Sequence, residues 1–186
     1  MWTYNYADEL YHYGVKGMKW GHRKKYYNSD GSLNKAGKAR QAYKDAKKNF
    51  KVSKRKLSKS SFTAFGVKGI ENYERQKAAT QKAYAKTVST KAKLKASTAK
   101  NEQQAAKREF ATYKNAMFKT GIPGSGGDVQ RGGASTAIYN DLKTRKGKEY
   151  ADKVVKRVQN ETIAMLATSA TVVLGQAALA AYSANH

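Results

Sequence analysis

The residues best suited to chemistry in this chain are lysines gathered in the middle of the sequence. Residues 34–120 hold twenty-four lysines and arginines against five aspartates and glutamates, and the whole chain has a formal net charge of +24. A cationic surface of this size binds polyanions by releasing counterions, and its affinity falls steeply as salt rises. Nucleic acid and anionic membrane are the two candidate polyanions.

Lysine carries a point charge, whereas sites that read bases prefer the planar fork of arginine. No sequence-reading module is recognisable, so we expect contacts to phosphate that are indifferent to base sequence. The alternative is that the lysines simply form a solvated helix face. The predicted polyanion-binding residues are Lys44, Lys47, Lys48, Lys51, Lys54, Arg55, Lys56, Lys82, Lys86, Lys91, Lys93 and Lys95.

Catalytic and metal-binding chemistry is not indicated by the sequence. His12 and His22 have no acidic residue placed to complete a metal site, and the chain contains no cysteine. The acidic residues form no pair suited to general acid–base work, and no serine lies in a GxSxG context. We therefore predict a protein that is not an enzyme, with no catalytic residues, no metal ion and no cofactor.

A second feature is the string YHYGVKGMKWGHRKK at residues 11–25, in which glycines alternate with aromatic rings. Glycine reaches backbone angles that other residues avoid, and tyrosine and tryptophan are enriched where protein surfaces meet. This composition favours a compact docking segment. The predicted partner-docking residues are His12, Tyr13, Gly14, Gly17, Met18, Trp20 and Gly21.

The string HYGVKGMKWG, followed at residues 26–40 by YYNSDGSLNKAGKAR, resembles a block in structural, head-associated proteins of tailed bacteriophages and prophages. The similarity covers about residues 11–45, and His22 departs from it where an aliphatic residue is expected. The resemblance implies a virion or prophage protein whose partners are other virion structural proteins, assembled in the host cytoplasm. It implies no reaction, because the block occurs on proteins with different remainders.

Helices must position these residues, and we predict a mainly α fold: an elongated basic helical hairpin with an aromatic, glycine-rich N-terminal segment and a C-terminal apolar helix. Residues 35–60 form the first helix, after a turn at residues 28–32 and an N-cap at Ser32 or Asn34. Its apolar seam, with residues spaced three and four apart, is Ala36, Ala39, Tyr43, Ala46, Phe50, Ser53 and Leu57.

The second arm of the hairpin is expected over residues 70–119, where no glycine or proline interrupts the chain. We expect one long helix that returns antiparallel on the first and extends beyond it. Between the arms, Phe65–Ile70 (FGVKGI) echoes Tyr13–Met18 (YGVKGM), either as a repeated turn unit or by coincidence.

The sequence divides into four segments. Residues 1–33 are the docking segment and residues 34–120 the basic long-helix region. Residues 121–133 are a glycine-rich linker, and residues 134–186 are a small helical region ending in an apolar helix. Within the last segment, Lys146-Gly147-Lys148 should separate two short helices.

The apolar helix is expected at Thr162–Ala181, which is long enough to cross a bilayer. Small residues recur on one of its faces, which permits close helix packing in a membrane or in a protein bundle. The helix is therefore either membrane-inserting or buried in a homo-oligomer. The residues predicted for this contact are Leu166, Ala167, Thr171, Val173, Gly175, Leu179 and Tyr182.

Together these features favour a bacteriophage virion accessory protein. Its N-terminal motif docks on another virion component, its basic helices contact DNA or another polyanion non-specifically, and its C-terminal helix reaches the host membrane at genome entry. Two alternatives remain open: a prophage-encoded, membrane-anchored effector that binds anionic lipid, and a non-specific DNA-compacting protein.

Overall fold

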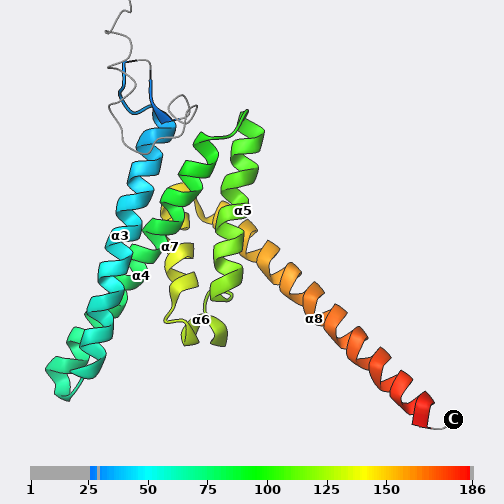
Figure 1. Ribbon diagram of the computed structural model, residues 1–186. Helices are drawn as coiled ribbons and strands as arrows, with labels where there is room; N and C mark the ends of the chain where they lie inside the picture. Colours follow the sequence, from blue (N-terminus) through cyan, green and yellow to red (C-terminus); the bar gives the residue numbers. More distant parts are fainter. Residues whose placement is uncertain (1–25, 29, 185–186) are drawn as a thin grey trace, which may run out of the picture.

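The computed structural model describes residues 26–28 and 30–184, which form helices joined by short turns (Figure 1). The predicted mainly α fold is confirmed. The docking residues between His12 and Gly21 lie outside the described residues. In chain order the helices are α3 (Lys35–Phe62), α4 (Gly66–Ser97), α5 (Glu102–Thr120), α6 (Gly126–Gln130), α7 (Ala134–Lys146) and α8 (Lys148–Ala184).

Helices α3 and α4 run antiparallel as a long hairpin (Figure 1), and the predicted seam of α3 is confirmed because all seven of its residues are buried or half-buried. The hydroxyl groups of Thr80 and Thr87 donate hydrogen bonds across the hairpin, each at 3.2 Å, to the carbonyl oxygens of Ser53 and Ala46. A side chain can reach the opposite backbone only where the two helices approach closely. Small residues at positions 46 and 53 permit that approach.

This close approach predicts the result of enlarging one seam residue. Ala46 is 3% exposed, so an Ala46→Leu side chain has no space between the helices. We expect the free energy of unfolding to fall by about 1–3 kcal/mol, the usual cost of overpacking. Urea unfolding followed by circular dichroism measures this change. Ala42→Leu, at an exposed position of α3, is the control and should leave stability nearly unchanged.

The first turn of α3 is held by the segment before it. Asn34 is the N-cap, one of the two residues predicted for this role, and its side-chain oxygen accepts from the Gly37 amide at 2.9 Å. The Tyr26 carbonyl oxygen lies so close to Gly37 that a Cβ atom there would be 2.1 Å from it. The Tyr26 ring also packs on the Arg40 guanidinium, 4.5 Å from ring centroid to Cζ. Tyr26 and Asn34 are therefore held against the first turn of α3.

The single long helix predicted over residues 70–119 is wrong. Helix α4 ends at Ser97, and α5 begins at Glu102 and folds back beside α4 (Figure 1). Asn101 caps α5 by accepting from the Gln104 amide, and the Gln104 side chain accepts from the Lys100 amide, each at 2.8 Å. This reciprocal cap stabilises a helix start at residue 102, and the second arm does not overshoot the first.

The main hydrophobic cluster lies between α4, α5, α7 and α8. It combines ten buried residues with partly buried neighbours, including the contact between the Phe110 and Tyr150 rings at 6.0 Å. Of the described residues, none from α3 belongs to this cluster, so α3 packs on the outside of the bundle. The buried members are Ala85, Val88, Ala92, Tyr113, Met117, Ile138, Leu142, Ala151, Val154 and Val158.

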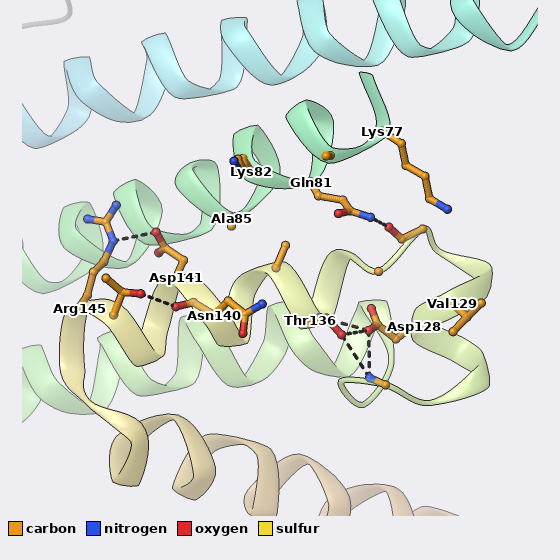
Figure 2. Close-up of a pocket in the computed structure, with 16 residues that line it drawn as sticks. Lys77, Gln81, Lys82, Ala85, Asp128, Val129, Thr136, Asn140, Asp141 and Arg145 are labelled. Atoms are coloured by element: carbon orange, nitrogen blue, oxygen red, sulfur yellow. Dashed lines mark hydrogen bonds and ion pairs between the residues drawn. The ribbon is translucent and has the colours of Figure 1, made fainter. Parts of the chain in front are cut away.

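Residues 121–133 are more ordered than the flexible linker that we predicted. They include the short helix α6 and the Asp128 side chain, which is 1% exposed. One oxygen of Asp128 accepts from the Ser135 amide at 2.7 Å, and the other accepts from the Thr136 amide and hydroxyl and from the Gly124 amide (Figure 2). The carboxylate thus caps α7, whose own N-cap is Gly133, and ties this segment to the bundle.

The C-terminal region is built around α8. The predicted break at Gly147 is confirmed, because α7 ends at Lys146 and α8 begins at Lys148. The separate apolar helix predicted at residues 162–181 is instead the distal part of α8, which leaves the bundle as a single helix (Figure 1). Within the described part of the chain, no helix combines the length and apolarity needed to cross a membrane, so a spanning role is not confirmed.

Candidate polyanion interface

The ion pairs of the described residues all lie outside the α3–α4 hairpin. Among the described residues, every ion pair joins side chains of α5, α7 and α8, such as Lys114–Glu161 at 2.9 Å and Lys146–Glu109 at 3.2 Å. The twelve predicted polyanion-binding side chains all lie on α3 and α4, all are exposed, and within the described chain none is in an ion pair. The hairpin charge is therefore free to attract an external anion.

Four of these cations form a line along α3, which we call the outer row: Lys44, Lys48, Lys51 and Arg55. Residues spaced four and three apart share one face of a helix. Each member lies two residues from Ala46 or Ser53, about 200° around the helix from the seam that faces α4. The outer row therefore points away from the rest of the molecule.

The charge density of α3 is close to that of a nucleic-acid strand. Its 28 residues include eleven lysines and arginines and one acidic residue, Asp45. At a rise of 1.5 Å per residue the helix is about 42 Å long, which gives one cation per about 4 Å. One strand of DNA carries one phosphate per about 3.4 Å. The linear charge density of α3 is thus comparable to that of one DNA strand along the duplex axis, and its cations are spread over more than one face of the helix.

The cations of α4 lie on two different sides of that helix. Lys82, Lys86 and Lys93 share one face by their spacing, and Lys82 borders the cavity between α4 and α7. Lys91 and Lys95 instead line a hollow between α3 and α5. The structure therefore brings the twelve predicted residues together on one hairpin without placing them all on one face.

A cationic groove follows α4 between α3 and α5. It consists of two adjoining hollows of about 400 and 320 Å³ that share Tyr84, and no acidic residue lines either of them. Three of its cations, Lys77, Lys119 and Arg131, were not among the predicted residues. No local pattern marks them, because four separate elements bring the groove together. Its cations are Lys54, Lys77, Lys91, Lys95, Lys119 and Arg131.

Aromatic rings line the same groove. The Phe50 and Tyr84 rings pack with centroids 5.2 Å apart, and Tyr43 lies in the wall of the larger hollow. Burial raises the pKa of the Tyr84 hydroxyl, so this tyrosine stays neutral at physiological pH and adds no negative charge. A cationic groove with aromatic side chains has the chemistry that contacts both the backbone and the bases of a nucleic acid.

A third cavity, between α4 and α7, has a different character. It measures about 770 Å³ and is lined by cations and acids together (Figure 2). Asp128 accepts four hydrogen bonds, and Asp141 pairs with Arg145 at 2.9 Å through Oδ1, while its buried Oδ2 accepts no hydrogen bond from the described residues. The acids of the cavity wall therefore stabilise the bundle, and the wall lacks the uniform positive charge of the groove.

The residues predicted for membrane or oligomer contact lie on the distal part of α8. The Leu166 side chain is 65% exposed, and Ala167 is exposed as well. For Thr171, Val173, Gly175, Leu179 and Tyr182 the structure describes the helical backbone alone. Ile163 and Met165 are exposed beside Leu166, so this part of α8 presents apolar side chains to its surroundings.

Comparison with known proteins adds one short match. The model of a family of unknown function (DUF7211) matches residues 3–26, which include the aromatic, glycine-rich string. No curated protein and no solved structure matches the chain. The match falls on the segment before the hairpin and ends where the described residues begin.

Proposed function

We propose that this chain is an accessory structural protein of a bacteriophage virion that binds nucleic-acid phosphate non-specifically through its α3–α4 hairpin. The observation that carries the proposal is the concentration of exposed cations on the hairpin, which form no ion pair within the described chain. The resemblance of residues 11–45 to phage head-associated proteins supplies the virion setting. The proposed role is adhesion between genome and particle, without a catalysed reaction.

The binding mode follows from the two cationic surfaces. The outer row contacts phosphates along a duplex, and the cationic groove adds contacts to backbone and exposed bases. Lysine dominates both surfaces, whereas side chains that read base edges are typically the planar fork of arginine. We therefore expect neither surface to read base sequence. Contacts to phosphate fix position and carry no sequence information.

Sequence indifference is a direct test of this mode. Equilibrium binding of the full chain to two duplexes of equal length and unrelated sequence is measured by fluorescence anisotropy. We expect dissociation constants that agree within about twofold, because phosphate is common to both. A preference of tenfold or more for one sequence would show base readout and contradict the proposed mode.

Attachment to the particle is assigned to the N-terminal segment. Docking would bury Tyr13, Met18 and Trp20, and each contributes on the order of 1.5–3 kcal/mol if fully buried. Trp20 has the largest ring of the three. We expect Trp20→Ala to be lost from purified particles, as measured by quantitative mass spectrometry. Circular dichroism of the same variant should show unchanged helix content, and normal incorporation would refute the docking role.

The membrane-anchored effector stays the alternative to the virion role. The exposed apolar residues Ile163, Met165 and Leu166 are suited to contact between copies of α8. A homo-oligomer joined through α8 therefore forms part of the proposal.

A further inference from the structure

The turn between α3 and α4 exposes an unusual group of apolar side chains. Phe62 is 78% exposed, Phe65 is 85% exposed and Val67 is 74% exposed, and Ile70 lies beside them at 51%. Single exposed apolar residues are common on protein surfaces, but four of them within nine residues form a patch of the kind that marks an interaction site. We call these four residues the tip cluster.

The tip cluster stands apart from the rest of the molecule. The α3–α4 turn lies at the far end of the hairpin, at the lower left of Figure 1, while α5, α7 and α8 pack nearer the other end of α4. None of the four residues belongs to the hydrophobic cluster of the bundle. The tip therefore projects its apolar side chains outward, where an external surface can reach them first.

At the end of α3 several carbonyl oxygens accept hydrogen bonds within the turn, whereas Phe65, the N-cap of α4, supplies no side-chain hydrogen bond to that helix. The hydroxyl groups of Ser60 and Ser61 donate to carbonyl oxygens one turn earlier at 2.9 and 2.7 Å, and the Thr63 amide donates to the Ser60 carbonyl at 3.2 Å. Gly69 lets the two arms close tightly, because a Cβ atom there would lie 2.6 Å from the Thr63 oxygen.

The charge around the tip cluster favours an anionic partner. Residues 59–75 include Lys59, Lys68 and Arg75 against Glu71 and Glu74, and α3 and α4 together hold nineteen lysines and arginines against three acidic residues. Lysine side chains beside an apolar group can reach anionic headgroups while the apolar group enters the hydrocarbon. The cavities described above are lined by none of the four residues of the tip cluster.

We propose that the tip cluster inserts into the boundary between headgroups and acyl chains of an anionic lipid bilayer. Phe62, Phe65 and Val67 enter the bilayer, and Lys59 and Lys68 bind its headgroups. The hairpin attaches end-on, so its shaft remains available for polyanion binding. This inference is independent of the proposed DNA binding, since it rests on the exposed apolar residues of the turn.

The absence of cysteine from the chain makes a site-specific probe available. Val67→Cys places a single thiol at the tip for an environment-sensitive NBD label, and Val52→Cys places the same label on the shaft. Val52 is also exposed, at 49%, and lies about 15 Å along α3 from Phe62. The full-length labelled proteins are mixed with vesicles of phosphatidylcholine alone or with phosphatidylglycerol.

The expected result is a blue shift and a several-fold rise in NBD emission at position 67 with vesicles containing phosphatidylglycerol. The label at position 52 should change little, and neither label should respond to phosphatidylcholine alone. Unchanged emission at position 67 with the anionic vesicles would overturn the proposal. An equal response at both positions would also overturn it, because it would show that the shaft enters the lipid.

A double variant tests whether the aromatic rings are responsible. Phe62→Ser with Phe65→Ser should lower partition into anionic vesicles about tenfold or more, whereas the control Val52→Ser should not. DNA affinity should be unchanged in both variants, so failure of the tip proposal and failure of the DNA proposal give different results.

Equal partition of the double variant and the unmodified chain would refute the inference. Loss of self-association instead of lipid binding, measured by light scattering, would assign the tip to a second copy and refute it as well.

Discussion

Replacing Lys44, Lys48, Lys51 and Arg55 together by glutamine is expected to weaken binding of duplex DNA about a hundredfold at low salt. These residues form the outer row, and within the described chain none has an acidic partner to lose. Each phosphate contact contributes about 0.9 to the slope of log affinity against log salt, so the slope should also fall by about 3 to 4. Fluorescence anisotropy at several salt concentrations measures both quantities.

The matched control removes the same number of charges elsewhere. Lys143, Lys148, Lys153 and Lys156 lie on α7 and α8, and all four are exposed. Their replacement by glutamine should change DNA affinity much less than the loss of the outer row. Glutamine has a helix propensity close to that of lysine, so both variants should keep their helix content. Equal losses of affinity would mean that net charge, and not the hairpin surface, determines binding.

Replacing Asp128 by alanine is expected to lower the free energy of unfolding by about 3 kcal/mol or more. The change leaves the amide groups of Ser135 and Thr136 without their acceptor, and the amide of Ser135 is buried, whereas the Gly124 amide keeps its bond to the Thr136 hydroxyl at 3.2 Å. An unsatisfied buried donor costs about 1–3 kcal/mol, and loss of a helix N-cap costs about 1 kcal/mol. Urea unfolding followed by circular dichroism gives the difference.

Two further variants separate the cap from a general effect of removing charge. Asp128→Asn keeps one carbonyl oxygen as an acceptor and should lose less stability than the alanine variant. Asp45→Ala removes an exposed carboxylate from α3 and should change stability by less than about 0.5 kcal/mol. If Asp128→Ala proved as stable as the unmodified chain, the capping role of this carboxylate would be wrong.

The hairpin could be predicted from the sequence because the apolar residues of α3 recur at helical spacing. The seam of α3 repeats at helical spacing, and the structure buries or half-buries every predicted member. The apolar residues of α7 and the first half of α8 follow the same logic, and Ile138, Leu142, Val154 and Val158 are buried.

The errors arose where local side-chain hydrogen bonds decide the structure. The string Asn101–Gln104 (NEQQ) is a capping signal, and it breaks a segment whose lack of glycine and proline had suggested one helix. The glycines of residues 121–133 suggested flexibility, but Asp128 organises them through partners that include residues up to eight positions later. Such contacts depend on how α7 is placed, which composition does not reveal.

The candidate site could be predicted only in part for a related reason. Exposed lysines on one helix are readable from spacing, so the outer row follows from the sequence. The groove combines Lys54, Lys77 and Lys119 from three helices, and its existence depends on α5 folding back beside α4. The tip cluster was likewise missed, because apolar residues at a turn look like core until their exposure is known.

The salt dependence of DNA binding by the full-length chain tests the central claim most directly. Affinity for a duplex of arbitrary sequence is measured between about 50 and 200 mM salt. We predict binding at low salt whose logarithm falls linearly with log salt, with a slope magnitude of about 4 or more from the outer row and its neighbours. No binding at 50 mM salt, or an affinity that does not change with salt, would contradict the account.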